Sequence, residues 1–163
     1  MRSARFKAAL ALGLLCVCGC AGGVGRTERA GHVMLAPDEL QWKPAPPGLP
    51  AGAEAAAVEG DPAKPGHFAL RLRAPDGYRI PPHWHSRAER LTVLSGTFNL
   101  GTGDRFDPSA ARPLPPGGYA MLPPRMNHFA FAKGPVVVQV SGQGPFDIHY
   151  VDRADDPRGA SAK

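Results

Sequence analysis

The sequence predicts an all-β domain, either a sandwich or a barrel. Short runs of alternating apolar and polar residues recur roughly every eight to twelve residues, as in such folds. The 163 residues include 20 glycines and 19 prolines, and no stretch has the periodicity of a long helix. This length is enough for one domain with a hydrophobic core and short for two. We therefore expect a single domain over residues 33–157.

The first twenty residues, MRSARFKAALALGLLCVCGC, have the pattern of an export signal. Three basic residues precede an apolar run that is too short to span a bilayer comfortably. The run ends in VCGC, which resembles a bacterial lipobox with Cys20 as the acylated residue. We expect residues 1–19 to be a lipoprotein-type signal peptide and the chain to be exported, to the periplasm or to the outer membrane. An ordinary secretory signal that is cut slightly later is the alternative.

The mature chain carries little net charge. The whole chain has a formal net charge of +5, and removing the three basic residues of the signal leaves +2. Because this excess is dispersed, it forms no basic stripe and argues against nucleic acid as a partner. All three cysteines lie in the first twenty residues, so the mature domain has no internal disulfide.

The elements follow in order along the chain. Residues 20–32 are small and polar and are expected to be a tether. One helical turn is predicted near 37–42, a proline- and glycine-rich connector after it, and an edge strand over 53–60. The remaining strands are expected at 67–73, 78–85, 90–95, 97–100, 119–122, 127–132, 136–141 and 146–151, with 90–95 and 97–100 forming a hairpin around Gly96. Residues 158–163 are expected to be a disordered tail.

One strand carries a pair of candidate metal ligands. Side chains alternate between the two faces of a strand, so His83 and His85 point the same way and Trp84 the other. If the chain resumes as a strand after a bend, Glu89 keeps this parity and faces inward. A carboxylate on an inward, otherwise apolar face is costly to bury unless it binds a cation. The pattern therefore indicates a metal site.

The same stretch resembles the first motif of the cupin superfamily. Gly77, five residues, His83-x-His85, three residues, Glu89, six residues and Gly96 match every fixed position of that motif. The resemblance implies an antiparallel jelly-roll β-barrel of the small, single-domain, cupin_2 type.

A second cupin motif is similar to a stretch further along the chain. Gly117, five residues, Pro123 and then His128 fit its spacing. Arg125 stands where the motif usually has glycine, and Ala132 where it often has asparagine. These departures concern the turn and the closure of the sheet more than His128.

The resemblance implies one divalent metal ion held by His83, His85, Glu89 and His128, with open positions for water or substrate. Iron, manganese, zinc, nickel and copper all remain candidates, because this ligand set does not choose among them. The candidate pocket-lining residues are Tyr78, Leu91, Val93, Phe98, Tyr119, Met121 and Arg125.

Two functions fit this reading. The first is an exported metal-dependent enzyme acting on a small molecule, of oxygenase, isomerase or hydrolase type. The alternative is a non-catalytic metal- or ligand-binding module, such as a sensor. We expect a small-molecule ligand, and contact with the membrane only through lipid on Cys20. Small cupins often pair as dimers, so a homodimer is a further expectation from the resemblance.

Overall fold

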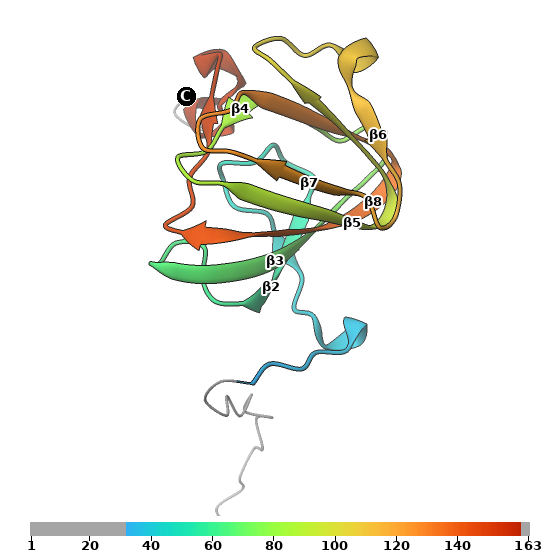
Figure 1. The fold of residues 1–163 in the computed structure, drawn as a ribbon, viewed down its shortest axis with the longest axis vertical. Helices are drawn as coiled ribbons and strands as arrows, with labels where there is room; N and C mark the ends of the chain where they lie inside the picture. Colours follow the sequence, from blue (N-terminus) through green and yellow to red (C-terminus); the bar gives the residue numbers. More distant parts are fainter. Residues whose placement is uncertain (1–31, 161–163) are drawn as a thin grey trace, which may run out of the picture. The chain divides into compact units, whose positions relative to one another are not determined.

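A computed structural model of the chain describes residues 32–160. The predicted signal peptide, the lipidation site Cys20 and the tether up to residue 31 lie outside the described residues. The described part is almost entirely β-structure, as predicted (Figure 1). Among the described residues, no helix is long and apolar enough to cross a membrane.

Nine strands form the domain, with short helical turns between them. The strands are β1 (Lys43–Pro44), β2 (Glu54–Glu59), β3 (Gly66–Ala74), β4 (Arg79–Trp84), β5 (Glu89–Thr102), β6 (Arg112–Leu114), β7 (Tyr119–Leu122), β8 (His128–Gly144) and β9 (His149–Tyr150). The helical turns are η1 (Pro37–Glu39), η2 (Pro108–Ala110), η3 (Arg153–Asp155) and the four-residue helix α1 (Pro157–Ala160).

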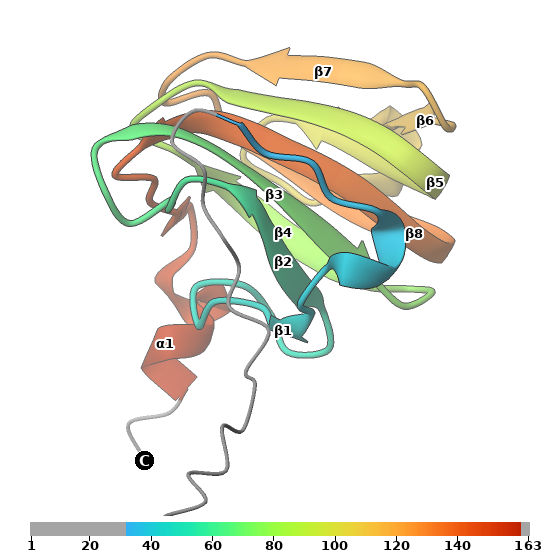
Figure 2. The ribbon, with the colours of Figure 1, turned by 90° about the horizontal axis from the view of Figure 1, so that it is seen from below.

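All nine strands belong to one antiparallel sheet that curls around its inner face (Figure 2). The path of the sheet runs β1-β2-β3-β8-β4-β9, and β5 joins it through β8 while also pairing with β6 and β7. Strand β8 is the centre of this arrangement, because it pairs with β3, β4 and β5. The result is the antiparallel jelly roll that the sequence predicted.

Two predicted boundaries are wrong. Residues 90–95 and 97–100 do not form a hairpin around Gly96 but are one strand, β5, and the predicted strands 127–132 and 136–141 are likewise one strand, β8. The two long strands pair with each other on both sides of their bends, as Val93↔Val138 and Phe98↔Ala132 show. Gly96 has φ +75°, and a Cβ there would lie 2.2 Å from the carbonyl oxygen of Pro135. Glycine therefore serves a close approach of two backbones here and not a reversal of the chain.

A short helix lies near the end of the described residues. Helix α1 extends to residue 160, into the segment 158–163 that was expected to be a disordered tail. Arg158 accounts for this order, because its guanidinium makes two hydrogen bonds to the Asp156 carboxylate and a third to the carbonyl of Ile148 at 3.0 Å. The short helix is thereby attached to the segment before β9.

The hydrophobic core lies on the inner face of the curled sheet. Its most deeply buried large side chains are Phe68, Val93 and Val138. Along the start of β5, Glu89, Leu91 and Val93 are buried and alternate with more exposed neighbours, which is the predicted parity. The same inner face therefore carries both the core and the candidate ligands.

Candidate metal centre

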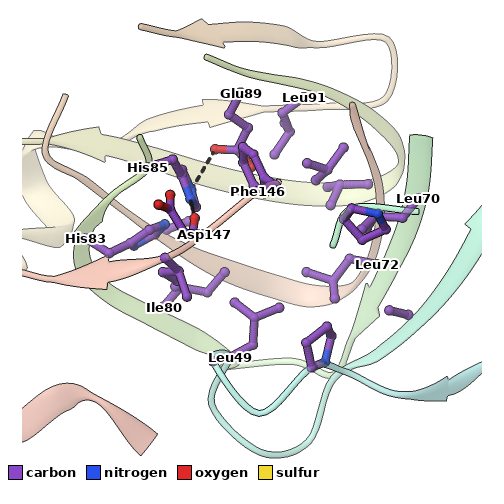
Figure 3. Close-up of a pocket in the computed structure, with 18 of the residues that line it drawn as sticks. Leu49, Leu70, Leu72, Ile80, His83, His85, Glu89, Leu91, Phe146 and Asp147 are labelled. Carbon is purple, nitrogen blue, oxygen red and sulfur yellow. Dashed lines mark hydrogen bonds and ion pairs between the residues drawn. The ribbon is translucent and has the colours of Figure 1, made fainter. Parts of the chain in front are cut away.

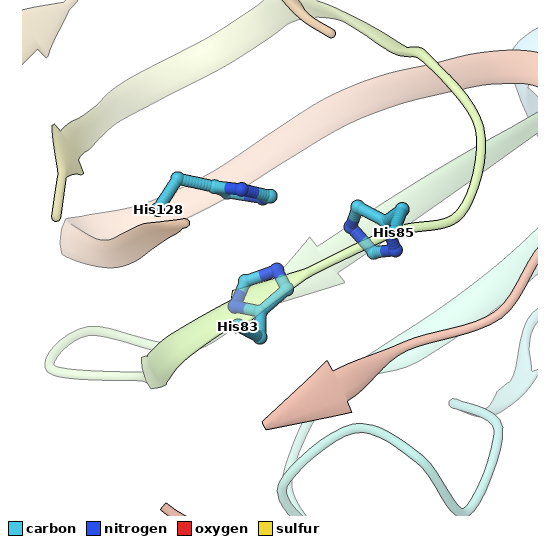
Figure 4. Close-up of side chains that lie close together, drawn as sticks. All are labelled: His83, His85 and His128. Carbon is cyan, nitrogen blue, oxygen red and sulfur yellow. The ribbon is translucent and has the colours of Figure 1, made fainter. Parts of the chain in front are cut away.

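Strand pairing brings the two predicted motifs together. His83 of β4 lies directly opposite His128 of β8 in the antiparallel register, and His85 follows two residues after His83 on the same face. Each of the three histidines offers a ring nitrogen, and these nitrogens all lie within 4.8 Å of one another (Figure 4). All three side chains are buried. The convergence predicted from the sequence is therefore present in the fold.

Glu89, at the start of β5, adjoins this group. Its Oε2 lies 3.3 Å from Nε2 of His128 and 3.5 Å from Nε2 of His85, and the residue is 8% exposed. Burial alone would raise the pKa of this carboxyl, but the neighbouring imidazoles of His128 and His85 more than offset it and hold the pKa well below its usual value. Glu89 is therefore a buried carboxylate anion beside three imidazoles.

Backbone carbonyls fix the orientation of all three rings. Nδ1 of each histidine donates a hydrogen bond to a backbone carbonyl oxygen. His83 donates to Pro81 at 2.7 Å, His128 donates to Met126 at 2.9 Å, and His85 donates to Asp147. A ring that carries its proton on Nδ1 presents the lone pair of Nε2. This is the way in which proteins usually orient a metal-binding imidazole.

Two ring nitrogens make no well-formed hydrogen bond. Nε2 of His85 and Nε2 of His128 are buried, and the Glu89 carboxylate, 3.5 and 3.3 Å away, does not have the geometry of a hydrogen bond to either. Leaving buried polar atoms unpaired is costly, and native structures seldom do so without a reason. A cation bound by these lone pairs and by the Glu89 carboxylate would satisfy all three groups. The residues present therefore fit a divalent metal ion.

The protonation of His83 agrees with this fit. Burial, helped by the charges of the neighbouring imidazoles, lowers the pKa of His83 to about 3. The ring is therefore neutral at pH 7, which is the form that coordinates a metal.

A cavity of about 320 Å³ opens beside the centre (Figure 3). His83, His85, Glu89 and His128 all contribute to its wall. Most of the rest of the wall is aliphatic or aromatic, including Leu70, Leu72, Ile80, Leu91, Phe98 and Val140. Its volume is at the low end of the range of sites for small molecules.

The predicted pocket lining is only partly right. Leu91 and Phe98 line the cavity, whereas the other five residues do not. Tyr119 and Met121 lie on the outer face of β7 and are 58% and 51% exposed, because Leu122, on the same strand with the opposite parity, is the buried one. The residues predicted to face inward on β7 were therefore the wrong alternating set.

The remaining three candidates are displaced for separate reasons. Val93 does face inward but packs within the core. Tyr78 is buried, and its hydroxyl donates a hydrogen bond to the carbonyl of Pro50 at 2.7 Å. Arg125 is exposed, lies over the ring of Trp84, and has a φ of +63°. That left-handed conformation explains why the cupin motif usually has glycine at this position.

Two residues of the site were not predicted. Phe146 stacks on the ring of His85, with 4.4 Å between centroids, and Asp147 provides the carbonyl for that same ring. Both belong to the segment before β9, about sixty residues from His85 in the chain. No local pattern marks a residue that acts through its backbone carbonyl.

Comparisons with known proteins agree on the fold. No family model matches the sequence, and no curated protein matches it. Among solved structures, the polyketide cyclase RemF from Streptomyces resistomycificus is 15% identical, with a TM-score of 0.63 over 80% of this chain and 92% of that one. KdgF from Halomonas sp. is 21% identical, with a TM-score of 0.53 over 70% of this chain and 94% of that one.

A third similar structure is named as a cupin. It is a cupin 2 domain-containing protein from Halorhodospira halophila, 20% identical, with a TM-score of 0.53 over 69% of this chain and 83% of that one. The chain thus shares the jelly-roll fold of these cupin structures, and its histidine group, which could hold a metal ion, lies on the inner face of that fold.

Proposed function

We propose that this protein binds one divalent metal ion through His83, His85, His128 and Glu89, and that it uses this centre to bind and transform a small molecule in the adjoining cavity. The observation that carries the proposal is the pair of buried, unpartnered Nε2 atoms of His85 and His128. When bound, such an ion supplies Lewis acidity toward an oxygen atom of the molecule. The likeness to a structure described as a polyketide cyclase supports an enzymatic role.

The residues of the chain prepare the site in three ways. Backbone carbonyls hold the rings so that their Nε2 atoms face one another. The Glu89 carboxylate supplies one negative charge against the charge of the ion. The apolar wall lowers the local polarity beside the centre and so strengthens the electrostatic interactions within it.

One observation favours the alternative of a non-catalytic ligand-binding module. Beyond the four candidate ligands, the described residues of the cavity wall include two ionisable side chains, Asp147 and Arg158. Each is already engaged with other groups, Asp147 with Ser86 and Arg158 with Asp156. An acid or base for proton transfer would then have to come from the ligand set itself.

Metal analysis of purified protein tests the proposal. We expect about one divalent ion per chain by elemental analysis, and its loss in the His128→Ala variant, since this removes one of three imidazoles. His67→Ala is the matched control, because His67 is exposed and lies outside the centre. Equal metal content in both variants would refute the ligand assignment. The metal found would also narrow the reaction class.

We further propose that the chain is exported and carries lipid on Cys20, as the sequence pattern VCGC suggests. This region lies outside the described residues, so the proposal rests on the sequence. Mass spectrometry of protein from its native membrane should find a diacylglycerol on Cys20. An unmodified N-terminus downstream of Cys20 would overturn it. Two or more acyl chains are enough for stable anchoring, at about 0.8 kcal/mol per buried CH₂.

A further inference from the structure

The cavity has a polar end and an apolar end. Figure 3 shows His83 and His85 on one side of it, and Leu70 and Leu72 on the opposite side. A molecule that fills the cavity must therefore present different chemistry at its two ends.

The two charged side chains that line the cavity outside the four candidate ligands already form hydrogen bonds within the protein. The Asp147 carboxylate accepts hydrogen bonds from the backbone N–H of Ser86 at 2.7 Å and from its hydroxyl at 2.6 Å. The Arg158 guanidinium is bound in two places by the Asp156 carboxylate, at 2.8 and 2.7 Å. Among the described residues that line the cavity, no side chain other than these two and the four candidate ligands His83, His85, Glu89 and His128 is charged or polar.

We propose that the cavity takes a neutral, largely apolar organic molecule with a single oxygen-bearing end that points toward the histidines. The part of this inference that concerns the oxygen rests on the proposed metal centre. The part that concerns the apolar body rests on the wall alone. Both parts name the substrate class more narrowly than the proposed function does.

This class excludes several common metabolites. Sugars, nucleotides and dicarboxylates carry polar or charged groups along their whole length. At the leucine end these groups would lose water without gaining a partner, which is unfavourable for a hydroxyl and much more so for a charge. The apolar body of the proposed ligand instead gains free energy from the same burial.

Two bicyclic probes that differ at one end test the inference. 2-Naphthol has a hydroxyl at one end and an apolar ring at the other, and 6-hydroxynaphthalene-2-sulfonate adds a charge at the far end. Fluorescence titration of the protein, at measured metal content, should show that 2-naphthol binds at least about tenfold more tightly, since the sulfonate must bury an unpaired charge. Equal affinity for the two probes would overturn the proposal.

A matched pair of variants on β5 locates the binding. Leu100 lines the cavity and Leu94 lies on the outer face of the same strand, 40% exposed. Leu100→Gln should weaken 2-naphthol binding by about tenfold or more, as expected for lost apolar contacts in a pocket. Leu94→Gln should leave the affinity unchanged. Leu49→Gln, in the connector that borders the cavity, should weaken binding as well and provides a second test if Leu100→Gln does not fold.

The design separates this inference from the proposed function. If the protein holds metal but does not distinguish the two probes, the ligand class is wrong while the metal centre stands. If it holds no metal and still prefers 2-naphthol with the same sensitivity to Leu100→Gln, the apolar site stands and the metal centre is wrong. Chelating the metal should weaken 2-naphthol binding without removing the preference, because the two ends of the probe are recognised separately.

Discussion

The backbone carbonyl of Asp147 accepts a hydrogen bond from Nδ1 of His85, a residue 62 positions earlier in the chain. The side chain of Asp147 strengthens this link, because its carboxylate binds both the backbone N–H and the hydroxyl of Ser86, the residue after His85. One residue thus holds His85 through its carbonyl and the following peptide through its carboxylate.

Asp147→Ala should therefore lower metal affinity without removing a ligand. Loss of the carboxylate frees the segment that orients His85. Removing a group that positions a metal ligand typically lowers metal affinity by about 10- to 100-fold. Competition titration against a chromophoric chelator measures the effect.

Asp107→Ala provides the control for this change. The Asp107 carboxylate likewise accepts hydrogen bonds from the backbone N–H and the hydroxyl of a serine, Ser109, but it lies in a loop outside the centre. We expect this variant to lose a comparable local motif and keep its metal affinity. A similar loss of affinity in both variants would show that Asp147 has only a general structural role.

Metal removal should lower the melting temperature. The folded chain buries Glu89 and three imidazoles together, and a cation that binds only this state stabilises it. At a free metal concentration one thousand times Kd the stabilisation is about 4 kcal/mol. Thermal unfolding with and without chelator measures it, and His128→Ala should abolish the difference. An unchanged melt on protein that was metal-loaded at the start would contradict the prediction.

Stability should fall at alkaline pH because of Tyr78. Burial raises the pKa of the Tyr78 hydroxyl from 10.0 to about 12, so folding favours the neutral phenol. Its contribution is complete below pH 10 and is lost as the pH rises from 10 to about 12. Urea unfolding across this range should show the decline.

Tyr78→Phe should make that decline shallower. The variant should also lose about 1 kcal/mol at pH 8, because the hydrogen bond to the Pro50 carbonyl is gone. Burial raises the pKa of Tyr150 as well, so some decline remains. Tyr119→Phe, at an exposed position of β7, should leave the stability at pH 8 unchanged. A Tyr78→Phe variant with the full alkaline decline would contradict the assignment.

Glycine should be more stabilising than alanine at position 125. Arg125 has a φ of +63°, a conformation that costs a residue with a Cβ about 1–2 kcal/mol. Arg125→Gly and Arg125→Ala both lose the contact with Trp84, so their difference isolates the backbone. Chemical denaturation should rank Gly above Ala, the reverse of the order at ordinary positions.

Site residues that follow from the pattern of a single strand were predicted from the sequence, and those that depend on contacts between distant segments were harder to predict. The parity of His83, His85 and Glu89 follows from strand alternation, which survives into the structure. His128 required the resemblance to a second motif, because its partner strand is distant in the chain. Asp147 and Phe146 could not be predicted, since one acts through a backbone carbonyl and the other through a stacking contact made only after folding.

The errors in strand boundaries have a common cause. Glycine was interpreted as a chain reversal at Gly96, and a strand was ended before Pro135, where the two longest strands pair closely. The same residue types permit tight turns and close backbone approach. Only the pairing of β5 with β8 distinguishes the two uses.

The last helical turn of the chain has a practical bearing on purification. Arg158 borders the cavity, and Gly48 of the connector lies close to both Arg158 and Ile148. An affinity tag appended to the carboxyl terminus would continue a segment that borders this cavity. Such a tag should be cleaved before any soaking or screening campaign, or placed within the tether instead.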